Sequence, residues 1–151
     1  VRATIKEVKY SKSEFKNWLF DWSKTEKKGY KIHALYVEED NRIQGAISIR
    51  ENPQNMSIEI DIVESAPFNS SYNKKIKDKE YIGVAICLFV EVCKRSFENG
   101  YDGYVEFTAK SNLVKYYIDN MRAIPIDAQR MYINTSGARW LIEKYHGGVD
   151  L

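Results

Sequence analysis

Met56-Ser57-Ile58-Glu59-Ile60-Asp61-Ile62-Val63-Glu64 opens the stretch of this chain that decides its fold. Apolar and polar residues alternate along it, which is typical of a strand. A lysine-rich loop follows, and the chain resumes as Glu80-Tyr81-Ile82-Gly83-Val84-Ala85 before a long apolar helix. First-turn backbone N–H groups lack intrahelical partners, and the helix dipole adds positive charge there. Because Gly83 has no Cβ, this strand, turn and helix start predict a phosphate site.

The composition is that of an ordinary globular domain. The chain has 151 residues, of which 44% are hydrophobic and 29% are charged. We therefore expect a single domain over residues 1–151. The net charge of +2 is too small to indicate nucleic-acid binding. We see no run of ~18 apolar residues and no charged-then-apolar leader, so we expect a cytoplasmic protein with no membrane partner.

Neither the cysteines nor the histidines indicate a disulfide or a metal site. Cys87 and Cys93 fall in one predicted helix, where their Cα atoms would be about 9 Å apart. A disulfide needs less than ~7 Å, so we expect two buried free thiols in a reducing cytoplasm. His33 and His146 have no Cys or carboxylate at ligand spacing, so no metal is expected.

The remaining patterns predict the element order β-α-β-β-β-α-β-α-β-β-α. Strands are expected at residues 4–9, 32–37, 43–50, 56–64, 103–109, 124–126 and 129–133. Helices are expected at residues 11–24, 81–99, 111–121 and 136–145. Three consecutive strands form a meander, and a right-handed helical crossover then joins two parallel strands. We expect an α/β (α+β) protein with a mixed, mostly antiparallel central sheet and helices on both faces.

This order resembles the GNAT superfamily of acyl-CoA-dependent N-acyltransferases over residues 4–133. GNAT proteins carry Gln or Arg, two residues, Gly, one residue and then Gly or Ala at the turn before the helix. Gly83 and Ala85 match this pattern, and Glu80 stands in the leading position. The run from Phe107 to Tyr117 looks like the fifth strand and following helix of the superfamily. A third match, Glu64-Ser65-Ala66-Pro67-Phe68-Asn69, looks like a turn of small bacterial GNAT proteins.

The resemblance implies that acetyl-CoA is the cosubstrate and that a primary amine attacks its thioester directly in a ternary complex. It also implies a set of cofactor contacts. The pyrophosphate would bind the backbone N–H groups of the helix start, and the pantetheine arm would contact a polar residue near the start of the later helix. These cofactor-binding residues are Val63, Ser65, Ile82, Gly83, Val84, Ala85, Ile86 and Asn112. Lysines 74, 75, 77 and 79 would either screen the CoA phosphates or form a solvated loop face.

The resemblance further implies that a tyrosine protonates the leaving thiolate, and Tyr117 is the candidate. A phenol with a pKa near ~10 is well matched to a thiol of pKa ~8.5 to 10. Tyr116 would point about 100° away on the same helix. The general base is sought among Glu64, Asp61 and Glu59. Strict alternation would put Glu59 and Asp61 on one face of the strand and Glu64 on the other. A water chain is the alternative to any single carboxylate.

Two classes of function remain open at this point. The first is an N-acetyltransferase whose acceptor is a small amine, an antibiotic, a protein N-terminus, a lysine or a charged tRNA. The second is a non-catalytic GNAT-fold module that binds CoA or a protein, with Glu80 and Arg122 reflecting a degraded site, because Arg122 stands where Gly is usual. Partners would be a small-molecule or protein amine, and both a monomer and a homodimer are compatible with the sequence.

Overall fold

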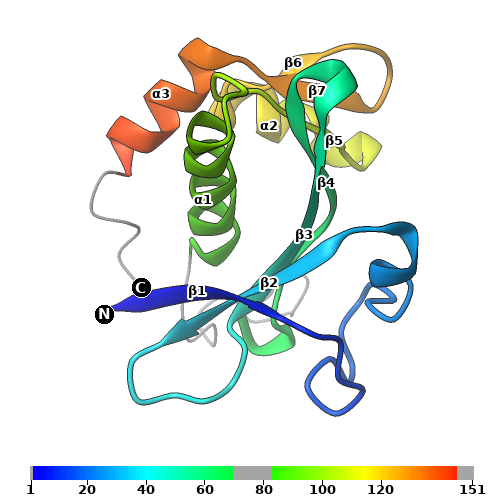
Figure 1. Ribbon diagram of the computed structural model, residues 1–151. Helices are drawn as coiled ribbons and strands as arrows, with labels where there is room; N and C mark the ends of the chain where they lie inside the picture. Colours follow the sequence, from blue (N-terminus) through cyan, green and yellow to red (C-terminus); the bar gives the residue numbers. More distant parts are fainter. Residues whose placement is uncertain (1, 70–82, 146–151) are drawn as a thin grey trace. The chain divides into compact units, whose positions relative to one another are not determined.

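A computed structural model of the chain describes residues 2–69 and 83–145, and Figure 1 shows its elements. The strands are β1 (Ala3–Val8), β2 (Lys31–Val37), β3 (Gly45–Asn52), β4 (Ser57–Ser65), β5 (Val105–Thr108), β6 (Ile124–Pro125) and β7 (Arg130–Ile133). The α-helices are α1 (Val84–Glu98), α2 (Val114–Met121) and α3 (Thr135–Lys144). Short 3-10 turns lie at Glu26–Lys28, Pro53–Asn55, Pro67–Asn69 and Ser111–Leu113. No helix of the described residues has the length and hydropathy needed to cross a bilayer.

The strands form one mixed sheet in the order β1-β2-β3-β4-β5-β7-β6. The pairs β1/β2, β2/β3, β5/β7 and β6/β7 are antiparallel, and β4/β5 is parallel. The mixed, mostly antiparallel sheet with helices is therefore confirmed. The parallel pair is joined through α1, as the predicted strand–helix–strand crossover requires.

The prediction of a helix at residues 11–24 is wrong. This segment consists of turns followed by the 3-10 turn Glu26–Lys28, and Asn17 has a positive φ of 68°. The spacing of Phe15, Trp18 and Trp22 predicted a helix, yet these rings pack on one another without one. The backbone N–H groups of Leu19 and Phe20 donate to the Glu64 carboxylate instead of to helical carbonyls.

By its internal contacts the chain divides into two compact units, and the first contains residues 2–49, 61–69 and 83–88. Part of its core is a cluster of buried side chains: Phe15, Trp22, Ile32, Ala34, Ile43 and Ala46. Gly45 on β3 lies close to the start of α1. A Cβ placed at Gly45 would lie 2.4 Å from Val84 Cγ1 and 3.2 Å from the Glu64 carbonyl oxygen. The absence of a side chain on β3 therefore allows the first residue of α1 to pack directly on that strand.

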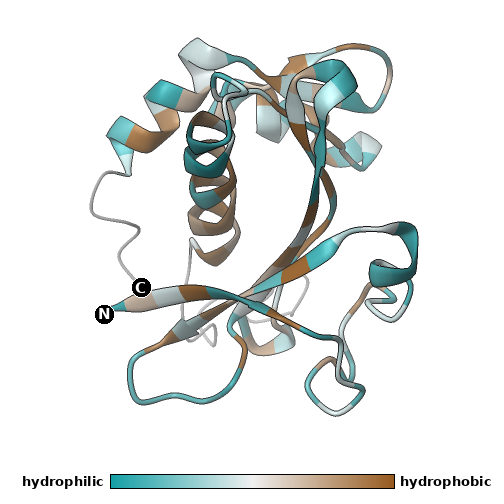
Figure 2. Cartoon of the chain, in the orientation of Figure 1, coloured by the Kyte–Doolittle hydropathy of each residue, from teal (hydrophilic) through white to brown (hydrophobic). Residues whose placement is uncertain are grey.

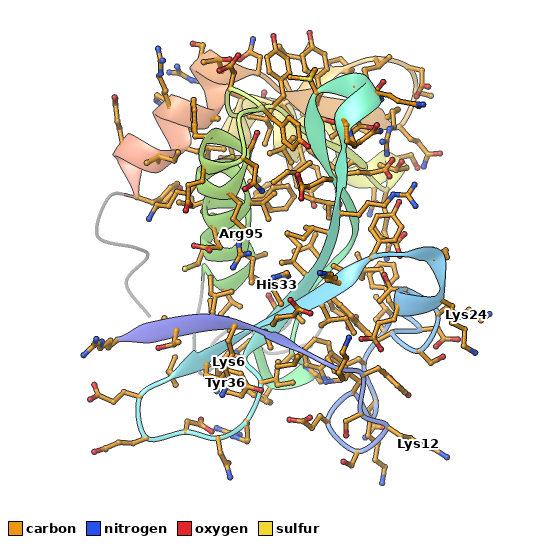
Figure 3. The ribbon with its side chains drawn as sticks, viewed as in Figure 1. Lys6, Lys12, Lys24, His33, Tyr36 and Arg95 are labelled. Atoms are coloured by element: carbon orange, nitrogen blue, oxygen red, sulfur yellow. The ribbon has the colours of Figure 1, made fainter. Side chains whose placement is uncertain are left out.

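β1 is an edge strand of the sheet and pairs with β2 in the first unit. Thr4 and Tyr36 are register partners on β1 and β2, and the Lys6 Nζ lies 4.7 Å from the centre of the Tyr36 ring (Figure 3). This lysine on an edge strand is a charge of the kind that discourages pairing with another chain.

The second unit contains Arg50–Ile60 and residues 89–145. Its core is formed by α1 residues such as Phe89 and Val92 together with Val105, Met131 and Ile133 of β5 and β7. Figure 2 shows hydrophobic residues concentrated along the central strands and on α1, with hydrophilic residues in the loops. The predicted end of α1 is confirmed, because the helix stops at Glu98 and Gly100 follows with φ 83°.

Both cysteines lie on α1 and both are free thiols, as expected. Cys93 is buried, and burial raises the pKa of its thiol to about 12. The prediction that Cys87 is also buried is wrong, because Cys87 is of intermediate exposure.

Candidate active site

The parallel register of β4 with β5 consists of Ile58 with Val105 and Glu59 with Glu106, although β4 has nine residues. Val63 and Ser65 lie near the end of β4, and both are half-buried.

The start of α1 follows directly on a glycine with a left-handed backbone conformation. Gly83 has φ 80°, in the left-handed region that favours glycine, and Val84 is the first helical residue. The Cys87 N–H donates to the Gly83 carbonyl at 3.0 Å. The N–H groups of Val84, Ala85 and Ile86 precede this bond, so the helix supplies no acceptor for them. Glu80, Ile82 and the four lysines of the preceding loop lie outside the described residues.

Glu64 is held by three donors from the turn segment. Its Oε2 accepts from Leu19 N at 2.6 Å, and its Oε1 accepts from Phe20 N at 3.1 Å and from the Trp22 indole Nε1 at 2.9 Å. Trp22 is only 1% exposed. The carboxylate therefore joins the end of β4 to a segment more than forty residues earlier in the chain.

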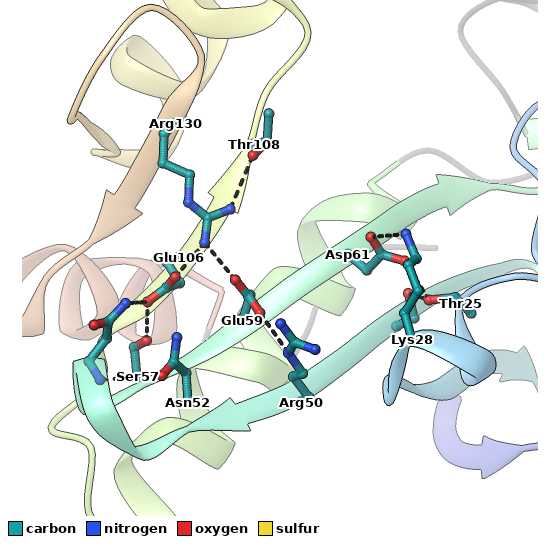
Figure 4. A network of polar contacts seen from close by, with 12 residues as sticks. Thr25, Lys28, Arg50, Asn52, Ser57, Glu59, Asp61, Glu106, Thr108 and Arg130 are labelled. Carbon is teal, nitrogen blue, oxygen red and sulfur yellow. Dashed lines mark hydrogen bonds and ion pairs between the residues drawn. The ribbon is translucent and has the colours of Figure 1, made fainter.

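Asp61 has a buried hydroxyl and an exposed lysine as its partners (Figure 4). Its Oδ2 accepts from Thr25 Oγ1 at 2.7 Å, and Thr25 Oγ1 in turn lies 2.8 Å from the Ser48 hydroxyl, which donates to it. Its Oδ1 lies 3.0 Å from the Nζ of Lys28, whose side chain is 56% exposed. Lys28 is thus the exposed member of this pair, whereas the Asp61 side chain is 16% exposed.

The contacts of Asp61, Ile62 and Glu64 agree with the predicted alternation of β4. Ile62 packs against the hydrophobic cluster that includes Trp22, and Glu64 bonds the Trp22 indole, so these alternate residues face the same cluster. Asp61, which lies between them, bonds Thr25 instead.

Glu59 belongs to an ion network of the second unit that the sequence did not reveal in full (Figure 4). Its carboxylate accepts from Arg50 Nε at 2.7 Å and from Arg130 Nη2 at 2.9 Å. The same Arg130 nitrogen donates to Glu106, which also accepts from Ser57 and Asn55. Glu106 is only 8% exposed. The sequence could have indicated Glu106 by its position between Val105 and Phe107 inside a strand, because a carboxylate buried there needs a cationic partner.

Tyr117 lies on α2 in a group of aromatic rings. Its ring centre is 5.0 Å from that of Phe107 on β5 and 5.7 Å from that of Phe89 on α1. Tyr117 is half-buried and its neighbour Tyr116 is exposed. Burial by nearby groups raises the pKa of Tyr116, and the proximity of Tyr145 adds to the effect. Asn112 is exposed within the 3-10 turn Ser111–Leu113.

Comparison with solved structures identifies the fold. An acetyltransferase from Bacillus subtilis in complex with CoA superposes with a TM-score of 0.59 at 10% identity, covering 88% of this chain and 99% of that one. A GNAT-family acetyltransferase from Staphylococcus aureus superposes with a TM-score of 0.56 at 14% identity, covering 89% of this chain and 99% of that one. A mutant of the toxin AtaT, bound to the C-terminus of the antitoxin AtaR, superposes with a TM-score of 0.59 at 11% identity. The match covers 94% of this chain and 98% of that one.

The chain has the fold of the GNAT acyl-CoA N-acyltransferases, as the sequence predicted. Comparison of the sequence with protein-family models and with curated proteins gives no match.

Proposed function

We propose that this protein transfers an acetyl group from acetyl-CoA to a primary amine. The observation that carries the proposal is Gly83, which has φ 80° directly before a helix whose first three amides have no intrahelical acceptor. This is the backbone arrangement that binds a pyrophosphate. It occurs in a chain with the GNAT fold, and a solved structure with this fold contains CoA.

In the proposed reaction the amine nitrogen attacks the thioester carbonyl carbon, a C–N bond forms, and the C–S bond breaks. The departing thiolate takes a proton from the phenol of Tyr117. The rings of Phe89 and Phe107 fix the Tyr117 ring by packing on it, which limits the positions of the hydroxyl. The amine must lose a proton before or during attack, so a base or a water chain completes the scheme.

Among the three candidate carboxylates, Asp61 is proposed as the base. Glu59 accepts hydrogen bonds from two arginines, and Glu64 accepts from three donors. Asp61 shares one oxygen with an exposed lysine that a substrate ammonium group can replace. On this proposal, Asp61→Asn lowers kcat.

The first experiment measures binding. Acetyl-CoA should raise the free energy of unfolding by RT ln(1 + [L]/Kd), about 2.7 kcal/mol at a hundredfold excess over Kd. Absence of any stabilisation at millimolar acetyl-CoA would contradict the proposal.

The second experiment measures transfer with a thiol-release assay over a panel of amines. The panel includes peptides, because the fold also occurs in a toxin that was solved with an antitoxin segment. Thiol release that depends on one amine supports the transferase. Tight CoA binding with no transfer to any amine would favour the non-catalytic binding module.

A further inference from the structure

The turn segment at residues 18–22 is held to β4 by a carboxylate rather than by regular backbone pairing. Glu64 accepts from the backbone of Leu19 and Phe20 and from the Trp22 indole, at 2.6, 3.1 and 2.9 Å. A carboxylate has about four lone-pair positions, and these three donors fill three of them. Hydrogen bonds to an ionised acceptor are roughly twice as strong as those between neutral groups.

Leu19 and Phe20 depend on this carboxylate because they are not part of a helix and lie outside the buried cluster. Asn17 has φ 68°, which interrupts any helix at the residue before Trp18. Two donors to Glu64 are main-chain amides, which would otherwise need water or another acceptor. Leu19 is 60% exposed and Phe20 is 37% exposed, so little apolar burial holds these two residues in place.

We infer that Glu64 is a positioning residue, whose carboxylate fixes the segment of Leu19, Phe20 and Trp22 beside the acyl group of bound acetyl-CoA. The location beside the acyl group rests on the proposed function, in which the flanking residues Val63 and Ser65 contact the cofactor. The anchoring itself rests only on the three hydrogen bonds. Proton transfer by Glu64 is not part of this role.

Substitution of Glu64 by Gln tests whether its carboxylate holds the turn segment at residues 18–22 in place. Leu19 N and Phe20 N donate to different oxygens of Glu64, and the Trp22 indole donates to the second of them. Gln places an NH₂ group at one of these two positions, where it faces a donor. Glu64→Gln should therefore lose part of the anchoring although the side chain keeps its size, and Glu64→Ala should lose all of it.

Amide hydrogen exchange and ¹H–¹⁵N NMR spectra measure the anchor directly. We expect the amides of Leu19 and Phe20 to exchange at least tenfold faster in Glu64→Ala, with an upfield shift of the Trp22 indole proton. Asp21→Asn is the matched control, because Asp21 lies in the same segment and bonds Ser23 rather than Glu64. Unchanged exchange at Leu19 and Phe20 in a folded Glu64→Ala protein would overturn the inference.

A second measurement tests where the segment lies. The probes are CoA and acetyl-CoA, and their spectra differ only through the acetyl group. In the wild type the Leu19 and Phe20 amides should shift between the two complexes, and in Glu64→Ala this difference should fall at least threefold. If both ligands bind and the amides do not distinguish them, the positioning role is overturned. If neither ligand binds while the exchange effect persists, the proposed function has failed and the anchor stands.

Discussion

At the scale of single residues, the three carboxylates of β4 differ in their hydrogen-bond and ion-pair partners. Glu59 lies between two arginines, Asp61 between a hydroxyl and an exposed lysine, and Glu64 against two amides and an indole. Charge–charge contacts to arginine and hydrogen bonds to fixed amides are hard to exchange, whereas an exposed ammonium group exchanges easily. Three carboxylates on one strand therefore have three different environments.

Tyr117→Phe tests the proposed acid. The change removes one oxygen and keeps the ring that packs on Phe89 and Phe107. A general acid typically contributes a factor of ~10²–10⁴, so kcat should fall by that amount while the Kd of acetyl-CoA stays nearly constant. Tyr116→Phe is the control, because it makes the same change at an exposed neighbour and should leave kcat unchanged. Wild-type kcat in Tyr117→Phe, under conditions where chemistry limits the rate, would assign Tyr117 a packing role.

The sequence proposed candidate site residues by type and position but did not reveal their partners. Glu59 and Asp61 stood out because an acid in a strand covered on both faces is costly unless it is paired or functional, and Glu64 stood out because it lies at the strand end. Their partners Arg130, Thr25 and Leu19 lie far away in the chain, and no spacing rule connects them. Glu106 was missed for the same reason, since its need for a cation is met by Arg130 from another strand.

At the scale of elements, α1 was predicted within a few residues at each end because both ends have local signals. Gly83 precedes its first residue and Gly100 follows its last turn, with φ of 80° and 83°. The segment at residues 11–24 has equally good helical spacing of aromatic residues, yet it forms turns. The N–H groups of Leu19 and Phe20 donate to Glu64, a long-range acceptor that local patterns do not reveal.

The two glycines that flank α1 allow a matched test of the cofactor site. Gly83→Ala and Gly100→Ala each force a side chain into a left-handed backbone, at a cost of roughly 1–2 kcal/mol. A Cβ at Gly100 would meet nothing within 4 Å. Both variants should therefore lose similar stability, but only Gly83→Ala should weaken CoA binding, and Gly83→Val should weaken it further. Calorimetry that gives the wild-type CoA affinity for a folded Gly83→Val protein would remove the anion-site assignment.

The Arg130 network provides a prediction about stability. One guanidinium nitrogen bonds Glu59 on β4 and Glu106 on β5, which are register partners. Arg130→Met would leave two facing carboxylates without this cation, at a cost of roughly 3 kcal/mol in the free energy of unfolding. Adding Glu106→Gln should restore much of the loss, because it removes one of the two like charges.

Arg50→Met is the comparison for this network. The Arg50 side chain is 43% exposed, so its loss should cost under about 1 kcal/mol. Urea unfolding measures all three variants. Equal losses for Arg130→Met and Arg50→Met, or no recovery in the double variant, would show that the network does not stabilise the second unit in this way.

At the scale of the whole molecule, stability should fall in acid. Three aspartates have lowered pKa values: Asp21 through the Ser23 hydroxyl, Asp40 through the Arg42 side chain, and Asp127 through the Arg130 backbone. The pKa of Asp40 is lowered from 3.8 to about 2. A lowered folded-state pKa contributes stability above the unfolded pKa, and that stability is lost as the pH falls through the folded value.

The free energy of unfolding should therefore decline between about pH 4 and pH 2, and the Asp40→Asn protein should show a shallower decline. Denaturant unfolding at several pH values measures both proteins. Parallel curves for the wild type and Asp40→Asn would remove Asp40 as a source of the acid sensitivity.

Gly45 has a consequence for how cofactor affinity can be tuned. A single methyl group there would collide with Val84, and so would push the beginning of α1 away from the strand behind it. On the proposed function, that helix start holds the pyrophosphate. The dissociation constant of CoA would then depend on a strand residue that never meets the ligand. A larger residue at position 45 would weaken CoA binding although no residue that contacts the cofactor had been changed.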